Sequence, residues 1–159
     1  VFGMFRTRLE DCGVEALMRI DPAMPAFLGS RLEMRQVLLH LVENAIDAMP
    51  DGGKLTVEGR VRTVEGGSEE TLFGDGTDGS TGKVVEIRVR DTGEVIPEAV
   101  RGDIFQPFFT TREVGKGKGL GLAVCRSLVE TRQGRIELEK SLPGNTCFRI
   151  LLPFEKVPA

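Results

Sequence analysis

Alternating apolar and polar residues constrain the fold of this chain more than any other feature of its sequence. In residues 54–64, KLTVEGRVRTV, apolar side chains alternate with charged or polar ones. The same alternation recurs in 84–91 and 135–141, and the mostly apolar segment 146–153 is predicted as a further strand. Alternation of this kind is typical of a half-buried strand with one wet face. The turn residues 143–145, Pro-Gly-Asn, join the last two segments, and a further strand is predicted at 14–20.

Two other segments carry apolar residues at three- and four-residue spacing, which predicts helices. The first runs from about Leu32 to Met49 and ends at the Pro-Asp-Gly-Gly sequence of 50–53. The second runs from about Leu120 to Thr131. Strands with one polar face, combined with strongly apolar helices, predict a two-layer α/β sandwich in which helices cover one side of a sheet.

Composition narrows the class of protein. A chain of 159 residues with 40% hydrophobic and 28% charged residues suits a single domain, here 1–159, and its net charge of −3 gives no broad basic face for nucleic acid. The cysteines, Cys12, Cys125 and Cys147, lack metal or redox spacing, which favours a reducing, cytoplasmic setting. No apolar run is long enough to span a membrane, so no membrane contact is expected, and the isolated domain is expected to be monomeric. Residues 1–13 are interpreted as the edge of a longer chain, and 65–82 as a flexible loop between two strands.

Residues 115–122, GKGKGLGL, place a glycine at every second position directly before the second helix. Glycine loses about 0.5–1 kcal/mol more backbone entropy than alanine when it is ordered, so this run indicates a need for backbone freedom. Main-chain N–H groups, the helix N-terminus, Lys116 and Lys118 could together approach an anion. The spacing fits neither a P-loop nor a dinucleotide fingerprint. A phosphate-binding loop and a plain linker are both compatible with these residues.

The first helix carries a polar stripe along one side. Its members recur at four-, three- and four-residue steps: Gln36, His40, Glu43 with Asn44, and Asp47. Asparagine is a poor residue for a helix interior, so Asn44 indicates a functional role. Its amide oxygen is a ligand of a type that suits Mg²⁺. A solvated helix face is the alternative interpretation.

Two further motifs lie between the strand predicted at 84–91 and the second helix. Asp91 ends a strand and is followed by Thr92 and Gly93, and a carboxylate there could accept a hydrogen bond from a ligand's amino group, although a simple turn is the alternative. Asp-Thr-Gly is also a signature of aspartic proteases, but charged residues flank it here. The segment 104–112, IFQPFFTTR, places Phe and Pro residues before two hydroxyls and a cation, and could equally anchor a loop.

In this order the motifs resemble the ATP-binding catalytic domain of sensor histidine kinases, a superfamily shared with DNA gyrase and MutL ATPases. The matches are the N box, the first glycine box, the F box, the second glycine box and the last strand, at residues 35–53, 91–97, 104–112, 115–130 and 144–153. The PFFTT form is most like nitrogen-regulator-type kinases. The resemblance covers about 14–153. It implies the Bergerat fold, an α/β two-layer sandwich whose mixed, mostly antiparallel sheet has its helices packed on one face.

The resemblance also implies roles for single residues. Asn44 should bind the Mg²⁺ that bridges the ATP phosphates, and Asp91 should accept the adenine amino group, with Gly93 leaving room for the base. Residues 108–119 should form the ATP lid, and Thr146 should lie near the adenine. The other residues expected at the nucleotide are Asp47, Val95, Ile96, Phe108, Thr110, Thr111, Lys116, Gly117, Lys118, Gly119, Leu120, Gly121 and Leu122.

Three residues depart from the pattern of the family. His40 stands where many kinases have Asn and gyrase-type ATPases have a Glu general base, so a catalytic or metal-linked role is weighed against that of a polar neighbour. Val95 replaces the second glycine of the first glycine box, which bears on backbone flexibility near the adenine. Lys118 replaces the usual Thr or Ser and could contact a phosphate. Glu43, next to Asn44, is the candidate to polarise the acceptor imidazole.

His40 is the only histidine and lies in the expected ATP-site helix, so this chain lacks the phosphoacceptor that family members carry on a dimerisation domain. The resemblance therefore predicts a protein histidine kinase domain that transfers the ATP γ-phosphoryl group to a histidine on a separate dimerisation domain of the same parent. A response regulator would act downstream, and the parent could be membrane-anchored. The alternatives are a free-standing serine kinase acting on an anti-anti-sigma partner and a nucleotide-sensing binding module with weak catalysis.

Overall fold

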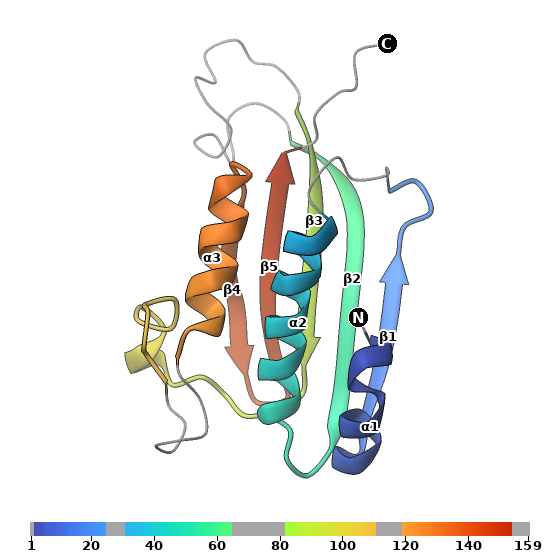
Figure 1. Ribbon diagram of the computed structural model, residues 1–159, viewed down its shortest axis with the longest axis vertical. Helices are drawn as coiled ribbons and strands as arrows, with labels where there is room; N and C mark the ends of the chain where they lie inside the picture. Colours follow the sequence, from blue (N-terminus) through green and yellow to red (C-terminus); the bar gives the residue numbers. More distant parts are fainter. Residues whose placement is uncertain (1, 25–30, 65–81, 111–118, 154–159) are drawn as a thin grey trace.

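The structure is a computed structural model that describes residues 2–24, 31–64, 82–110 and 119–153 (Figure 1). Its elements in chain order are α1 (Phe2–Cys12), β1 (Val14–Ile20), α2 (Arg31–Asp47), β2 (Gly53–Val64), β3 (Gly82–Asp91), the short 3₁₀ helix η1 (Glu98–Val100), α3 (Gly121–Thr131), β4 (Arg135–Leu142) and β5 (Asn145–Pro153). The strand predicted around 14–20 is confirmed as β1. The loop predicted at 65–82 lies outside the described residues except for Gly82, which begins β3.

Within the described residues the strands form one sheet in the order β1-β2-β3-β5-β4. β1 pairs with β2 in parallel, and the other neighbouring strands are antiparallel. The sheet is therefore mixed and mostly antiparallel, as the family resemblance implied. The register places Asp91 of β3 opposite Thr146 of β5, two residues that lie far apart in the sequence.

The helices pack on one face of this sheet, with α2 between α1 and α3 (Figure 1). The core lies between the two layers and includes Val37, Leu41, Val42, Ala45 and Ile46 of α2, Cys125 and Val129 of α3, and Leu55, Val57, Ile87, Val89 and Ile150 of the sheet. These strand residues are apolar members of the segments predicted as strands, so the predicted two-layer architecture is confirmed. No helix among the described residues is long and apolar enough to cross a membrane.

The polar face of the sheet is held by an ion-pair network around Glu86, which is only 1% exposed. Its carboxylate accepts hydrogen bonds from Arg60 Nε at 2.7 Å and Arg62 Nη1 at 2.8 Å. Arg88 Nη1 lies 2.9 Å away. Burial alone would raise the pKa of Glu86, but the hydrogen bonds from Arg62 and Arg60 outweigh it and hold the pKa below its usual range. The network explains how a charged side chain is buried on this face.

The helix α1 is a feature that the sequence analysis did not predict, because residues 1–13 were interpreted only as an edge. Leu9 of α1 is buried in the core, and Phe5 packs against it. Gly13 ends the helix with φ +67°, a conformation that favours glycine. Its carbonyl accepts a hydrogen bond of 3.3 Å from Gly53 N, which aligns the start of β1 with β2. α1 is therefore part of the helical layer and lies beside α2.

Candidate nucleotide site

Asp91 lies at the end of β3, in the lower part of Figure 1, where α2 ends and α3 begins. It is only 3% exposed, and Gly93 N donates a 2.9 Å hydrogen bond to its Oδ1. Burial raises the pKa of Asp91 to about 6, against the smaller lowering effect of the Gly93 hydrogen bond. A buried carboxyl with one oxygen held by the backbone can offer its other oxygen to a ligand.

The turn after β3 is docked tightly on the C-terminal end of α2. Glu94 N donates to the carbonyl of Ala48 at 3.0 Å. A Cβ on Gly93 would lie 2.4 Å from that same carbonyl oxygen. Only glycine permits this approach, and the approach is what brings the carboxyl of Asp91 to the end of α2.

Thr146 sits opposite Asp91 and is 3% exposed. Its hydroxyl and that of Ser141 are 2.8 Å apart, and Ile96 N donates to Ser141 Oγ at 2.9 Å. Arg101 completes this arrangement by donating to the carbonyls of Ile96 at 3.0 Å and Ser141 at 2.7 Å. The predicted residues Asp91, Thr146 and Ile96 are therefore brought together. Sequence reasoning missed Ser141, although its place in the hairpin across the 143–145 turn could have been read from the alternation, and it missed Arg101, for which the sequence carried no signal.

Val95 lies in the same loop but is 38% exposed, whereas Ile96 is half-buried and packs against the core. The loop is thus anchored through Ile96 and leaves Val95 at the surface. The departure from glycine at Val95 creates no steric conflict, because its side chain has space in the surrounding solvent.

The residues of the polar stripe of α2 lie against two different helices, α3 and α1. His40 and Asn44 are half-buried, and a Cβ on Gly121 would lie 3.3 Å from His40 Nδ1, which places His40 against the start of α3. Glu43 and Asp47 instead meet α1, where Arg8 bonds both carboxylates. Gln36, two turns earlier, is exposed. Arg8 is a further residue that sequence reasoning missed.

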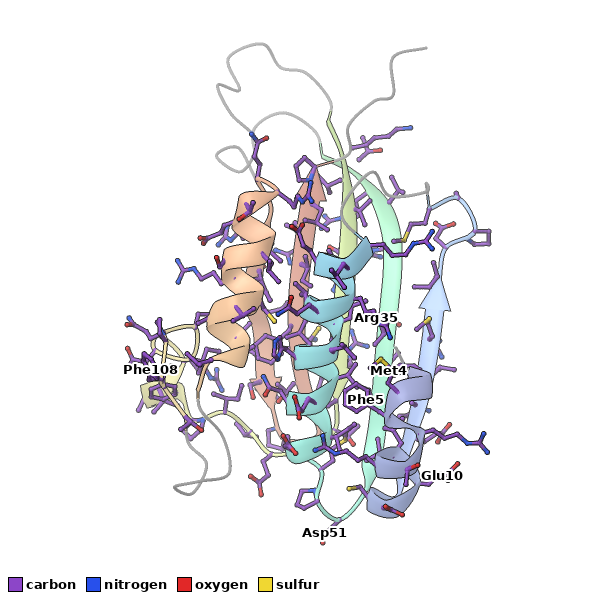
Figure 2. The ribbon with its side chains drawn as sticks, in the orientation of Figure 1. Met4, Phe5, Glu10, Arg35, Asp51 and Phe108 are labelled. Atoms are coloured by element: carbon purple, nitrogen blue, oxygen red, sulfur yellow. The ribbon has the colours of Figure 1, made fainter. Side chains whose placement is uncertain are left out.

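The structure describes the two ends of the lid motif, residues 108–110 and residue 119. Gly119 has φ +66°, and a Cβ there would lie 2.5 Å from the carbonyl carbon of Phe108, so the two ends of the lid touch. Phe108 itself has φ 65° and is 75% exposed; it projects away from the domain in Figure 2. Such a conformation is uncommon for a bulky residue and suggests a functional constraint. Thr110 is exposed. Thr111, Lys116, Gly117 and Lys118 lie outside the described residues.

The start of α3 continues from the lid. Leu120, its N-cap residue, is 36% exposed and provides no side-chain cap, and Gly121 begins the helix. The first-turn N–H groups therefore have no capping side chain and can serve an anion. Leu122 is half-buried and packs against the core, which anchors the helix start.

The donor set near α2 limits how a metal could be held. Among the described residues, no group of three or more His, Cys, Asp and Glu side chains is gathered in metal-binding geometry. A single amide such as Asn44 fits a cation that takes most of its oxygen ligands from water and from a bound phosphate ligand, which is how Mg²⁺ is usually held.

Comparison with known proteins agrees with this geometry. A family model described as "Histidine kinase-, DNA gyrase B-, and HSP90-like ATPase" matches residues 29–156. Sensor kinase CckA of Brucella abortus is 39% identical over 121 residues, covering 76% of this chain and 12% of that protein. Sensory histidine kinase/phosphatase NtrB of Salmonella typhimurium is 35% identical over 144 residues, covering 90% of this chain and 38% of that protein. The chain thus spans well under half of either relative.

Among solved structures, the catalytic domain of histidine kinase ThkA superposes with a TM-score of 0.72 at 25% identity, covering 96% of this chain and 86% of that chain. ThkA in complex with response regulator protein TrrA also matches, with a TM-score of 0.69. The predicted Bergerat fold is confirmed. The chain belongs to the family of histidine kinase-, DNA gyrase B- and HSP90-like ATPases, in which it corresponds to the ATP-binding catalytic domain of sensor histidine kinases.

Proposed function

We propose that this domain binds Mg-ATP between α2, the Asp91 turn and the start of α3, and transfers the γ-phosphoryl group to a histidine on a separate dimerisation domain of its parent protein. The observation that carries the proposal is the buried carboxyl of Asp91, which faces Thr146 across the strand register and adjoins the end of α2. This arrangement suits recognition of the adenine amino group. The free-standing serine kinase is not proposed, because the relatives reported above are sensor histidine kinases.

The residues are assigned in order from the adenine end of the nucleotide to its phosphate end. Asp91, Gly93 and Thr146 lie at the adenine end, where Val95 and Ile96 shape the loop. At the phosphate end Asn44 would hold Mg²⁺ jointly with phosphate oxygens, and the bound cation would neutralise the charge that develops there during transfer. The lid and helix start contribute the remaining residues: Phe108, Thr110, Thr111, Lys116, Gly117, Lys118, Gly119, Leu120, Gly121 and Leu122.

Catalysis in this proposal is positioning combined with charge stabilisation. Glu43 accepts a hydrogen bond from one ring N–H of the acceptor histidine, so that the lone pair of the other ring nitrogen points at the γ-phosphorus. The new P–N bond forms as the bond from the γ-phosphorus to the bridging oxygen breaks, and ADP leaves. His40, against the start of α3, is assigned to the phosphate end. Exclusion of water from the nucleotide is assigned to the segment 108–119, the lid expected from the family resemblance.

The proposal extends to the setting of the parent protein. The dimerisation domain and a response regulator are the expected partners, in line with the ThkA–TrrA complex. The domain is proposed to work in the cytoplasm without contact to membrane or nucleic acid, and as a monomer when isolated. Titration calorimetry with Mg-ATP tests binding, and radiolabelled ATP with the parent's dimerisation domain tests transfer. Absence of Mg-ATP binding up to millimolar concentration would refute the proposal.

Asn44→Ala should raise the Kd for Mg-ATP about 30-fold, because the protein then supplies no amide oxygen to the cation. In EDTA the variant and the wild type should bind ATP equally weakly, since the amide acts through the metal. Gln36→Ala is the matched control, an exposed amide two turns earlier on the same side of α2. An equal loss of affinity with and without Mg²⁺ would show that Asn44 does not act through the cation.

Glu43→Gln should lower the rate of histidine phosphorylation about 30-fold while the Kd for Mg-ATP stays within about twofold, because a hydrogen bond to a charged acceptor, worth about 1.5–3 kcal/mol, is lost during transfer. Glu33→Gln is the control, since Glu33 is another half-buried glutamate of α2, bonded at 2.7 Å to Arg132. Full phosphotransfer in the Glu43 variant would remove this residue from the mechanism.

A further inference from the structure

A single guanidinium connects α1 to the polar stripe of α2. Arg8 Nη1 lies 3.2 Å from Glu43 Oε1, and Arg8 Nη2 lies 2.7 Å from Asp47 Oδ1. The two acids are four residues apart, so Arg8 bridges one full turn of the helix. Phe5, which packs against the core, places its ring 6.0 Å from Arg8 Cζ and supports the guanidinium. Figure 2 shows Phe5 on the side of α1 toward α2 and Glu10 on the opposite side.

The two carboxylates carry negative charge close to the proposed phosphate site. Asp47 follows Asn44 by three residues in α2, a spacing at which Cβ atoms are about 5–6 Å apart, and Glu43 directly precedes Asn44. At the proposed site they would therefore stand within one Debye length, about 8–10 Å, of the negatively charged phosphates. Their side chains are only 47% and 29% exposed, so water screens them incompletely. Without a cation, two like charges would oppose nucleotide binding.

We propose that Arg8 is a positioning residue for nucleotide binding: it neutralises Glu43 and Asp47 through contacts to one oxygen of each carboxylate, so that the phosphates can approach Asn44. This inference rests on the proposed function. It gives α1 a role at the site although α1 contributes no residue to the family motifs. It also assigns Asp47, expected from the sequence to contact the nucleotide, a partner within the protein.

Arg8→Gln tests the inference, because half-exposed ion pairs add little to stability and the variant should fold. At low ionic strength the Kd for Mg-ATP should rise about 5- to 10-fold, and near 0.5 M salt, where the Debye length falls to about 4 Å, the difference should shrink to within about twofold. The Kd for adenosine, which carries no phosphate, should not change. Calorimetry at both salt concentrations with both ligands measures this.

Arg6→Gln is the matched control. It removes the same charge from the same helix, but Arg6 pairs at 3.0 Å with Glu10 and its side chain is 81% exposed. Its Kd for Mg-ATP should stay within about twofold of the wild type. Restoring the cation with Arg8→Lys should recover part of the lost affinity. Removing both acids from the Arg8→Gln variant, with Glu43→Gln and Asp47→Asn, should recover most of it.

Three results would overturn the inference while leaving the proposed function intact: wild-type affinity of Arg8→Gln at low salt, an equal loss of adenosine and Mg-ATP binding, or no recovery when both acids are removed. The second of these would indicate a packing role. Failure of the wild-type domain to bind Mg-ATP at all is a different result, and it would reject the proposed function and this inference together.

Discussion

Asp91→Asn is expected to weaken Mg-ATP binding about 100-fold and, at the same time, to stabilise the empty domain at neutral pH by about 2 kcal/mol. Loss of affinity follows because an asparagine amide that accepts from Gly93 N with its oxygen turns its NH₂ group toward the adenine amino group. A mismatch between buried polar groups costs about 1–3 kcal/mol, more when a charge is involved. Stabilisation follows because the buried carboxylate is itself unfavourable.

The sign of the stability change comes from the pKa of Asp91. Burial raises it from 3.8 to about 6 in the folded domain. The folded state therefore holds the proton more tightly, and its stability is fully present below pH 3.8 and falls as the pH rises through about 6. The cost of the ionised group at pH 7 is about 3 kcal/mol, of which the asparagine variant avoids a large part because it has nothing to ionise.

Urea unfolding followed by circular dichroism at pH 4.5 and pH 7.5, with calorimetry for Mg-ATP, measures both effects. Nucleotide affinity of the wild type should also fall as the pH drops below about 6, since protonation removes an acceptor oxygen. Asp51→Asn is the control, an exposed acid at the turn after α2 (Figure 2), and should change neither quantity. A variant of Asp91 that binds Mg-ATP as well as the wild type would exclude this carboxyl from adenine recognition.

Gly93→Ala is expected to destabilise the domain by about 3 kcal/mol, at the upper end of the usual cost of overpacking, and to abolish measurable Mg-ATP binding. The new Cβ would lie 2.4 Å from the oxygen and 2.8 Å from the carbonyl carbon of Ala48, and neither is the end of a flexible side chain. The turn must move away from α2, which breaks the Glu94–Ala48 hydrogen bond and displaces the amide that holds Asp91.

Gly102→Ala is the control for this change, because nothing lies within 4 Å of the Cβ it would create. Its unfolding midpoint and Mg-ATP affinity should match those of the wild type. For Gly93→Ala the midpoint of thermal unfolding should fall by about 6–12 °C, as expected for 3 kcal/mol in a domain of this size. Equal stability of the two alanine variants would mean that the contact with Ala48 is not a constraint on the site.

The sequence predicted the parts of the fold that obey a short period. The apolar residues of the alternating segments were placed on the correct face, because a one-residue error would turn every apolar side chain to solvent. Strand 14–20 was predicted in position only. The helix α3 was placed within one residue of its observed start at Gly121. By contrast α1 was not predicted. Its core-facing residues Phe2, Phe5, Leu9 and Cys12 do recur at three- and four-residue steps, but the stripe spans only three turns and only Leu9 is fully buried.

For the site, the order of the motifs in the sequence determined the family, and with it the placement of Asn44, Asp91, Gly93 and Thr146 around one end of the sheet. Tertiary structure alone decided which carboxylates are paired and which is buried. Arg8 meets Glu43 and Asp47 across more than thirty residues, 35 and 39 positions apart. Asp91 owes its raised pKa to burial by chain segments remote in sequence. Periodicity and motif spacing are local properties of a chain, so they can be read from the sequence. Charge pairing and desolvation depend on contacts between residues that are distant in the sequence, and only tertiary packing determines those contacts.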